Sequence, residues 1–68
     1  MKVTDIIEGL QIIQKYKPES ESDYHLRAEH DEIYVGSLDW VMSEQDKARM
    51  IELGWVQDDD VDGWSTHV

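Results

Sequence analysis

The residues whose types and spacing come nearest to a known chemistry form an acidic run late in the chain, Asp58-Asp59-Asp60-Val61-Asp62-Gly63. Carboxylates stand at its first, third and fifth positions and glycine at its sixth, as in an EF-hand calcium loop. Asp58, Asp60 and Asp62 are therefore a candidate calcium site. The bidentate glutamate and the exiting helix of an EF-hand have no place before the end of the sequence, however. We favour the alternative interpretation, an acidic hairpin turn between two tryptophans.

His25, His30 and His67 are possible metal ligands or general bases. His25 and His30 stand five residues apart, have no nucleophile beside them, and do not match the helical spacing of zinc proteases. The sequence also has no glycine-rich phosphate loop and no Ser, His and Asp arrangement that indicates a catalytic triad. We therefore expect that the protein is not an enzyme, that it needs no cofactor, and that none of its histidines binds a metal.

The charge of the chain limits its partners. Sixteen acidic residues against six basic ones give a net charge of −10. Direct binding to nucleic acid or to an anionic membrane needs clustered Lys and Arg, so both are excluded. A basic protein surface or a cation remains possible. The absence of cysteine excludes disulfides, and nothing resembles a signal peptide, so we expect a cytoplasmic protein.

Two helices are expected, at residues 5–16 and 44–53. The first shows apolar residues at helical spacing, has Thr4 as its candidate N-cap, and must end before Pro18. Gly9 inside this helix indicates a close packing contact. The second helix has Ser43 as its N-cap, and Gly54 suits a left-handed residue at its end.

Two hairpins are expected, near residues 25–36 and 55–68. A tight turn at His30-Asp31 places Leu26 opposite Val35 and Ala28 opposite Ile33 on one face, with Arg27 opposite Tyr34 on the other. The whole chain, residues 1–68, is then one small α+β domain of order α-β-β-α-β-β. Two helices packed on one face of a four-stranded antiparallel sheet form the natural two-layer solution.

Apolar residues of these elements define the expected core, and the remaining aromatic residues define possible contact points. The core positions are Ile6, Leu10, Ile13, Leu26, Ile33, Val35, Ile51 and Trp55. Tyr34 is the best candidate for an exposed aromatic residue because it faces away from Ile33 and Val35, and Trp40 is the second candidate. Exposed aromatic residues are typical anchors of protein interfaces.

The element order also places the acidic residues. If each element reverses the direction of the chain, most acidic segments meet at the end of the domain where the first helix finishes. The residues expected there are Glu19, Glu21, Asp23, Asp39, Glu44, Asp46, Asp58, Asp59, Asp60 and Asp62. Such crowding of like charge favours a basic partner or a cation, although a solvated polar end would also explain it.

Three segments resemble small acidic proteins encoded by bacteriophages and prophages. They are residues 29–36, the helix start at 43–49, and Leu53-Gly54-Trp55 followed by the acidic turn and Trp64. The resemblance covers nearly the whole chain and implies a phage origin. It implies no defined activity.

Together these features predict a non-enzymatic protein that binds and modulates or inhibits a host protein. The acidic surface could mimic nucleic acid and occupy a groove of a nucleic-acid-binding or defence protein. Its expected binding residues are Glu19, Glu21, Asp23, Asp58, Asp59, Asp60 and Asp62, with Tyr34 and Trp40 as the aromatic alternative. Calcium binding and a purely structural or self-associating role remain alternatives. A homodimer through the sheet face around Tyr34, or through an edge strand, would supplement a small core.

Overall fold

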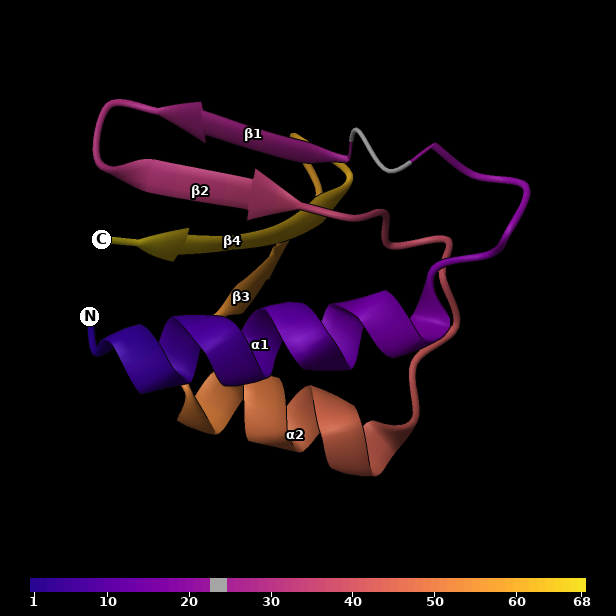
Figure 1. Cartoon of the computed structure of the whole chain (residues 1–68), viewed down its shortest axis with the longest axis horizontal. Helices are drawn as coiled ribbons and strands as arrows, with labels where there is room; N and C mark the ends of the chain where they lie inside the picture. Colours follow the sequence, from indigo (N-terminus) through magenta and orange to yellow (C-terminus); the bar gives the residue numbers. More distant parts are fainter. Residues whose placement is uncertain (23–24) are drawn as a thin grey trace.

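In the computed structural model, which describes residues 1–22 and 25–68, two helices pack against a four-stranded antiparallel sheet. Asp23 and Tyr24 lie outside the described residues. The element order is α-β-β-α-β-β, as the sequence predicts (Figure 1). The elements are α1 (Val3–Tyr16), β1 (Leu26–Glu29), β2 (Glu32–Val35), α2 (Glu44–Glu52), β3 (Val56–Asp58) and β4 (Gly63–His67).

Helix α1 begins earlier than the sequence indicates. Its N-cap is Lys2, which makes no side-chain capping bond, and Thr4 already lies inside the helix. The prediction of Thr4 as the cap is therefore wrong. A side-chain hydroxyl helps only a helix that starts directly after it, and here the Lys2 carbonyl already accepts hydrogen bonds from the amides of Asp5 and Ile6.

Helix α2 has the capping groups that the sequence predicts at both ends. The Ser43 hydroxyl accepts a hydrogen bond from the Asp46 amide. At the other end Gly54 is left-handed, with φ of 98°. The Gly54 amide donates to the Ile51 carbonyl, and the Trp55 amide donates to the Met50 carbonyl. These two bonds form a Schellman motif, which turns the chain from α2 into β3.

The sheet has the strand order β1-β2-β4-β3, so β1 and β3 form its edges. The predicted register of the first hairpin is confirmed at every pair: Leu26 with Val35, Arg27 with Tyr34, and Ala28 with Ile33. A two-residue turn at His30-Asp31 connects the strands, with His30 at positive φ. Strand β4 pairs with β2 on one side and with β3 on the other.

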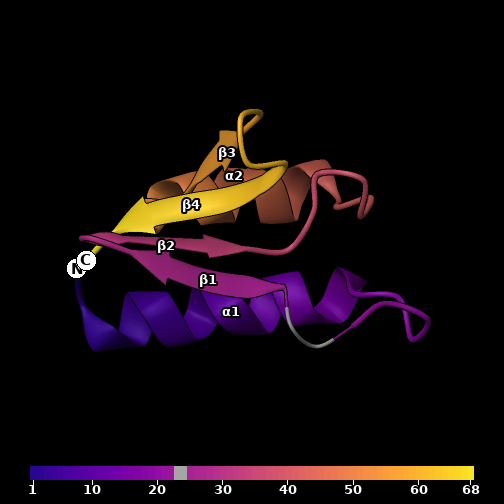
Figure 2. The same cartoon turned by 90° about the horizontal axis from the view of Figure 1, so that it is seen from above.

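Both helices lie on the same side of the sheet, as Figures 1 and 2 together show. The core lies between the helices and the sheet. It consists of Ile12, Ile13, Val35, Met42, Met50, Leu53, Trp55 and Trp64. Leu10 and Ile33 are half-buried against it. The side chains of Arg27, Tyr34, Ser65 and Val56 follow one another across the four strands on the other side of the sheet, which no helix covers.

Two predicted core residues are exposed. Leu26 is 59% exposed, because it stands on edge strand β1, where the sheet has a neighbour on one side only. Ile51 is 63% exposed, because the buried face of α2 passes through Met50, and the next residue of a helix points away from that face. Ile6 is half-buried.

Candidate functional site

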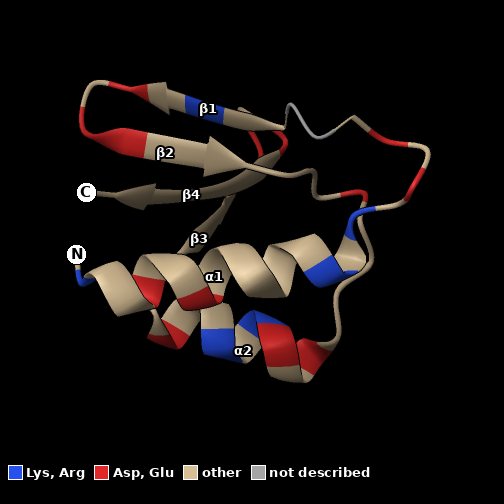
Figure 3. Cartoon of the chain, viewed as in Figure 1, with Lys and Arg blue, Asp and Glu red and all other residues tan. Residues whose placement is uncertain are grey.

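The acidic segments of the chain lie toward the end of the molecule where α1 ends and α2 begins, although Figure 2 shows the β3–β4 turn and the loop after α1 at opposite edges of that end. Figure 3 shows acidic residues there on the loop after α1, on the loop before α2 and at the start of α2, and the turn between β3 and β4 faces the same end. We call the segments 19–22, 39–46 and 58–62 the acidic end. The predicted reversal of direction at each element explains the grouping, because antiparallel neighbours bring alternate connections to the same end.

Hydrogen bonds join segment 58–62 to the residues just before segment 39–46. The Ser37 hydroxyl donates to the Asp62 carboxylate at 3.0 Å, and the Leu38 amide donates to the Asp62 carbonyl at 3.2 Å. The β3–β4 turn is therefore attached to the loop that leads to α2. The loop after α1 contributes Glu21, whose carboxylate lies 3.4 Å from the His25 imidazole. Of the acids expected here, Asp23 lies outside the described residues.

Some of these acids are already neutralised. Lys15 forms an ion pair with Asp46 at 2.8 Å, and the Tyr16 hydroxyl donates to the same carboxylate. The bond from Lys15, followed by that from Tyr16, lowers the pKa of Asp46. Lys47 lies 3.4 Å from Glu44. Within the described residues, Glu19, Asp39, Asp59 and Asp60 form no ion pair, so their charge remains available to a partner.

The acidic run 58–63 forms the turn of the second hairpin. The Asp60 amide donates to the Asp58 carboxylate, and Asp62 has positive φ. Gly63 does not have the positive φ of a sharp turn. It is needed for space, because a Cβ there would lie 2.8 Å from the Gly36 carbonyl oxygen. Calcium binding at Asp58, Asp60 and Asp62 stays a prediction.

An open groove of about 400 Å³ borders the acidic end on the uncovered side of the sheet. Its lining includes Arg27 and Tyr34 from the first hairpin and Asp60, Val61 and Asp62 from the β3–β4 turn, which we call the Asp60–Asp62 wall. The groove therefore connects the acidic turn with the aromatic residue that the sequence places on this face.

The two candidate aromatic anchors are less exposed than expected. Tyr34 is half-buried, its hydroxyl donates to Glu32 at 2.7 Å, and Arg27 lies 5.0 Å from its ring centre. The bond to Glu32, helped by burial, raises the pKa of Tyr34 to about 12. Trp40 packs against the core and meets the His25 ring edge-on at 5.1 Å. Both aromatic side chains thus contribute to the fold.

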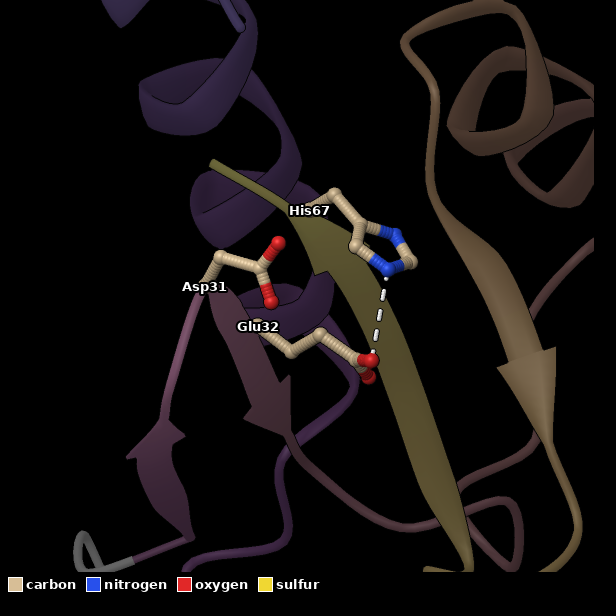
Figure 4. Close-up of side chains that lie close together, drawn as sticks. All are labelled: Asp31, Glu32 and His67. Atoms are coloured by element: carbon tan, nitrogen blue, oxygen red, sulfur yellow. Dashed lines mark ion pairs between the residues drawn. The ribbon is translucent and has the colours of Figure 1, made fainter.

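A second cluster lies at the opposite end of the molecule, where β1 turns into β2 and β4 finishes. Figure 4 shows the side chains of Asp31, Glu32 and His67 converging there. One ligand atom from each lies within 4.8 Å of the others, and the His67 imidazole forms an ion pair with Glu32 at 3.2 Å. Sequence analysis missed this group because Asp31 and His67 are distant in the chain and strand pairing alone brings them together.

Comparisons with known proteins found no likeness: the chain matches no protein-family model, no curated protein sequence and no solved structure. Among the described residues, neither helix has the length and apolar character needed to cross a membrane.

Proposed function

We propose that this chain is a non-enzymatic, phage-encoded protein that binds a host protein through its acidic end and modulates or inhibits it. The observation that carries the proposal is the placement of three separate acidic segments toward the same end of the long axis of a small fold. Like charges placed together repel one another and lower stability, so a complementary surface would recover free energy on binding. The charge of −10 makes a basic surface the natural partner.

The chemistry of the acidic end suits a groove that normally holds a phosphate backbone. Carboxylates on Glu19, Asp39, Asp59 and Asp60 can accept hydrogen bonds from Lys and Arg as phosphate oxygens do. A host nuclease or defence protein that binds nucleic acid would have such a groove. Occupying it would inhibit the host protein by competition, with fast and salt-sensitive association.

The groove beside the acidic turn offers a contact of more defined geometry than the general attraction between opposite charges. A Lys or Arg side chain that enters between Tyr34 and the Asp60–Asp62 wall would meet carboxylates and an aromatic ring together. Guanidinium groups pair well with both.

The aromatic alternative has less support. Tyr34 and Trp40 are both half-buried and bound to neighbouring residues, whereas interface anchors must offer free area to a partner. A homodimer stays a prediction, and its candidate surfaces are the sheet face around Tyr34 and the edge strands β1 and β3.

The test is capture of host proteins from lysate by two charge-matched variants. The acid-end variant carries Glu19→Gln, Asp59→Asn and Asp60→Asn, whose carboxylates form no ion pair within the described chain. The opposite-end variant carries Asp5→Asn, Glu29→Gln and Glu52→Gln.

Both variants lose three negative charges. We expect the wild type and the opposite-end variant to capture the same basic protein at low salt, and the acid-end variant to lose it. Capture by all three proteins that does not change with salt would overturn the proposal.

A further inference from the structure

We propose that Asp31, Glu32 and His67 form a binding site for a divalent transition-metal ion such as zinc. Each residue directs one possible ligand atom, an imidazole nitrogen or a carboxylate oxygen, into a space where all three atoms lie within 4.8 Å of one another (Figure 4). The site lies at the end of the molecule opposite the acidic end, and it is independent of the proposed function.

The backbone places the three ligand residues side by side before any metal arrives. Glu32 and His67 are direct partners across the β2–β4 ladder, so their side chains stand on the same face of the sheet. Asp31 belongs to the adjoining turn, and its carbonyl accepts a hydrogen bond from the Val68 amide at 2.8 Å. This bond attaches the end of β4 to the turn. A metal would therefore join the turn to β4, two segments that the backbone already holds together.

Glu32 is oriented in the way that metal-binding carboxylates commonly are. The Tyr34 hydroxyl donates to one oxygen, Oε2, at 2.7 Å, while the other, Oε1, lies 3.2 Å from His67 Nε2. Such outer partners set the direction of a ligand and raise its affinity for the metal. Tyr34 thus acts as a positioning residue for the other oxygen of Glu32, Oε1, which faces His67.

The ligand set selects among metals. One imidazole and two carboxylates suit zinc and its neighbours, whereas calcium and magnesium prefer oxygen ligands alone. Ligands of tetrahedral zinc stand at about 2.0–2.2 Å from the metal and therefore about 3.4 Å from one another. Glu32 Oε1 and His67 Nε2 already lie 3.2 Å apart, so the Asp31 oxygen is the ligand atom that must approach the other two. Asp31 and His67 are exposed, so rotation of their side chains can supply that movement. Water would complete the coordination.

Zinc titration of the untagged protein, followed by NMR, tests the site. We expect zinc to shift the imidazole signals of His67 before those of His25 and His30, and to raise the melting temperature. His67→Gln and Asp31→Asn should each weaken zinc binding by about tenfold or more. Calcium in excess should leave the His67 signals unchanged.

The matched control is His30→Asn, which removes a neighbouring imidazole outside the group and keeps a residue that tolerates positive φ. This variant should bind zinc like the wild type. The proposal is overturned if His67→Gln binds zinc as tightly as the wild type, if the signal changes centre on His25 or on residues 58–62, or if the His67 signals do not move at about millimolar zinc. Melting of each variant without metal shows that it is folded.

Discussion

The indole ring of Trp55 lies directly against the backbone of α1 at Gly9. A Cβ on Gly9 would overlap the indole Nε1 and would stand 2.6 Å from Cε2. Trp55 itself is 0% exposed, and its Nε1–H has no hydrogen-bond partner within the described residues. The predicted packing role of Gly9 is confirmed. This contact places α1 against Trp55, which stands at the junction between α2 and β3.

Gly9→Ala should therefore destabilise the protein, although alanine is normally preferred in helices. The propensity gain of about 1 kcal/mol is outweighed by the cost of moving a buried indole, so we expect a net loss of about 1–2 kcal/mol. Urea unfolding measures the change. The control is Gln11→Ala, at an exposed position of α1, which should be neutral or slightly stabilising. A more stable Gly9→Ala variant would contradict the packing described here.

Replacing Ser43 and replacing Thr4 by alanine should have different effects on the stability of the protein. Ser43→Ala removes an observed capping bond to the Asp46 amide and should cost about 1 kcal/mol of unfolding free energy. Thr4→Ala removes no capping bond, because α1 is capped at Lys2. It should change stability by less than about 0.5 kcal/mol. Thermal or urea unfolding of both variants measures these changes. Equal losses of unfolding free energy would show that Thr4 caps α1.

Much of this fold could be predicted from local patterns. The hairpin register followed from the alternation of apolar residues around His30-Asp31, because a shift by one residue would have placed Ile33 and Val35 on the wrong face. The α2 caps followed from Ser43 and Gly54, whose backbone preferences are strong. Such signals depend on neighbours in the sequence only.

The predictions that were wrong, and the group that was not predicted, depend on how the elements are arranged in space, which neighbouring residues in the sequence do not specify. Leu26 looked like a core residue because its strand pattern is apolar, but the strand order makes β1 an edge. Thr4 has the side chain of a cap, yet the helix had room to start earlier. The Asp31, Glu32 and His67 group requires β4 to pair with β2, and that pairing skips two intervening elements. The position of the acidic segments could be predicted because it depends only on consecutive elements running in opposite directions, which places alternate connections at the same end.

Acid should weaken the contact between α1 and α2. The pKa of Asp46 is lowered by the bond from Lys15 and then by that from Tyr16. A carboxyl whose pKa is lower in the folded state than in the unfolded state adds stability above the unfolded pKa, near 4, and loses it as the pH falls through the folded pKa. Glu8 behaves in the same direction, because Arg49 donates to it and lowers its pKa.

Asp46→Asn should lower stability at neutral pH and should make the remaining stability less sensitive to acid below about pH 4. The measurement is the urea midpoint from neutral pH to about pH 2. Asp39→Asn is the control, since it removes the same charge from the acidic end without removing an ion pair. Identical pH profiles for the two variants would mean that the Lys15–Asp46 pair does not stabilise the fold.

The most direct test of the central claim is the association rate with the captured host protein, measured over a salt series. The wild type and the opposite-end variant should associate fast at low salt and slow down together as salt rises. The acid-end variant should associate about tenfold more slowly at low salt and should show a weaker salt dependence, because the charges that guide the encounter are gone. Equal rates for the two charge-matched variants at every salt concentration would contradict binding through the acidic end.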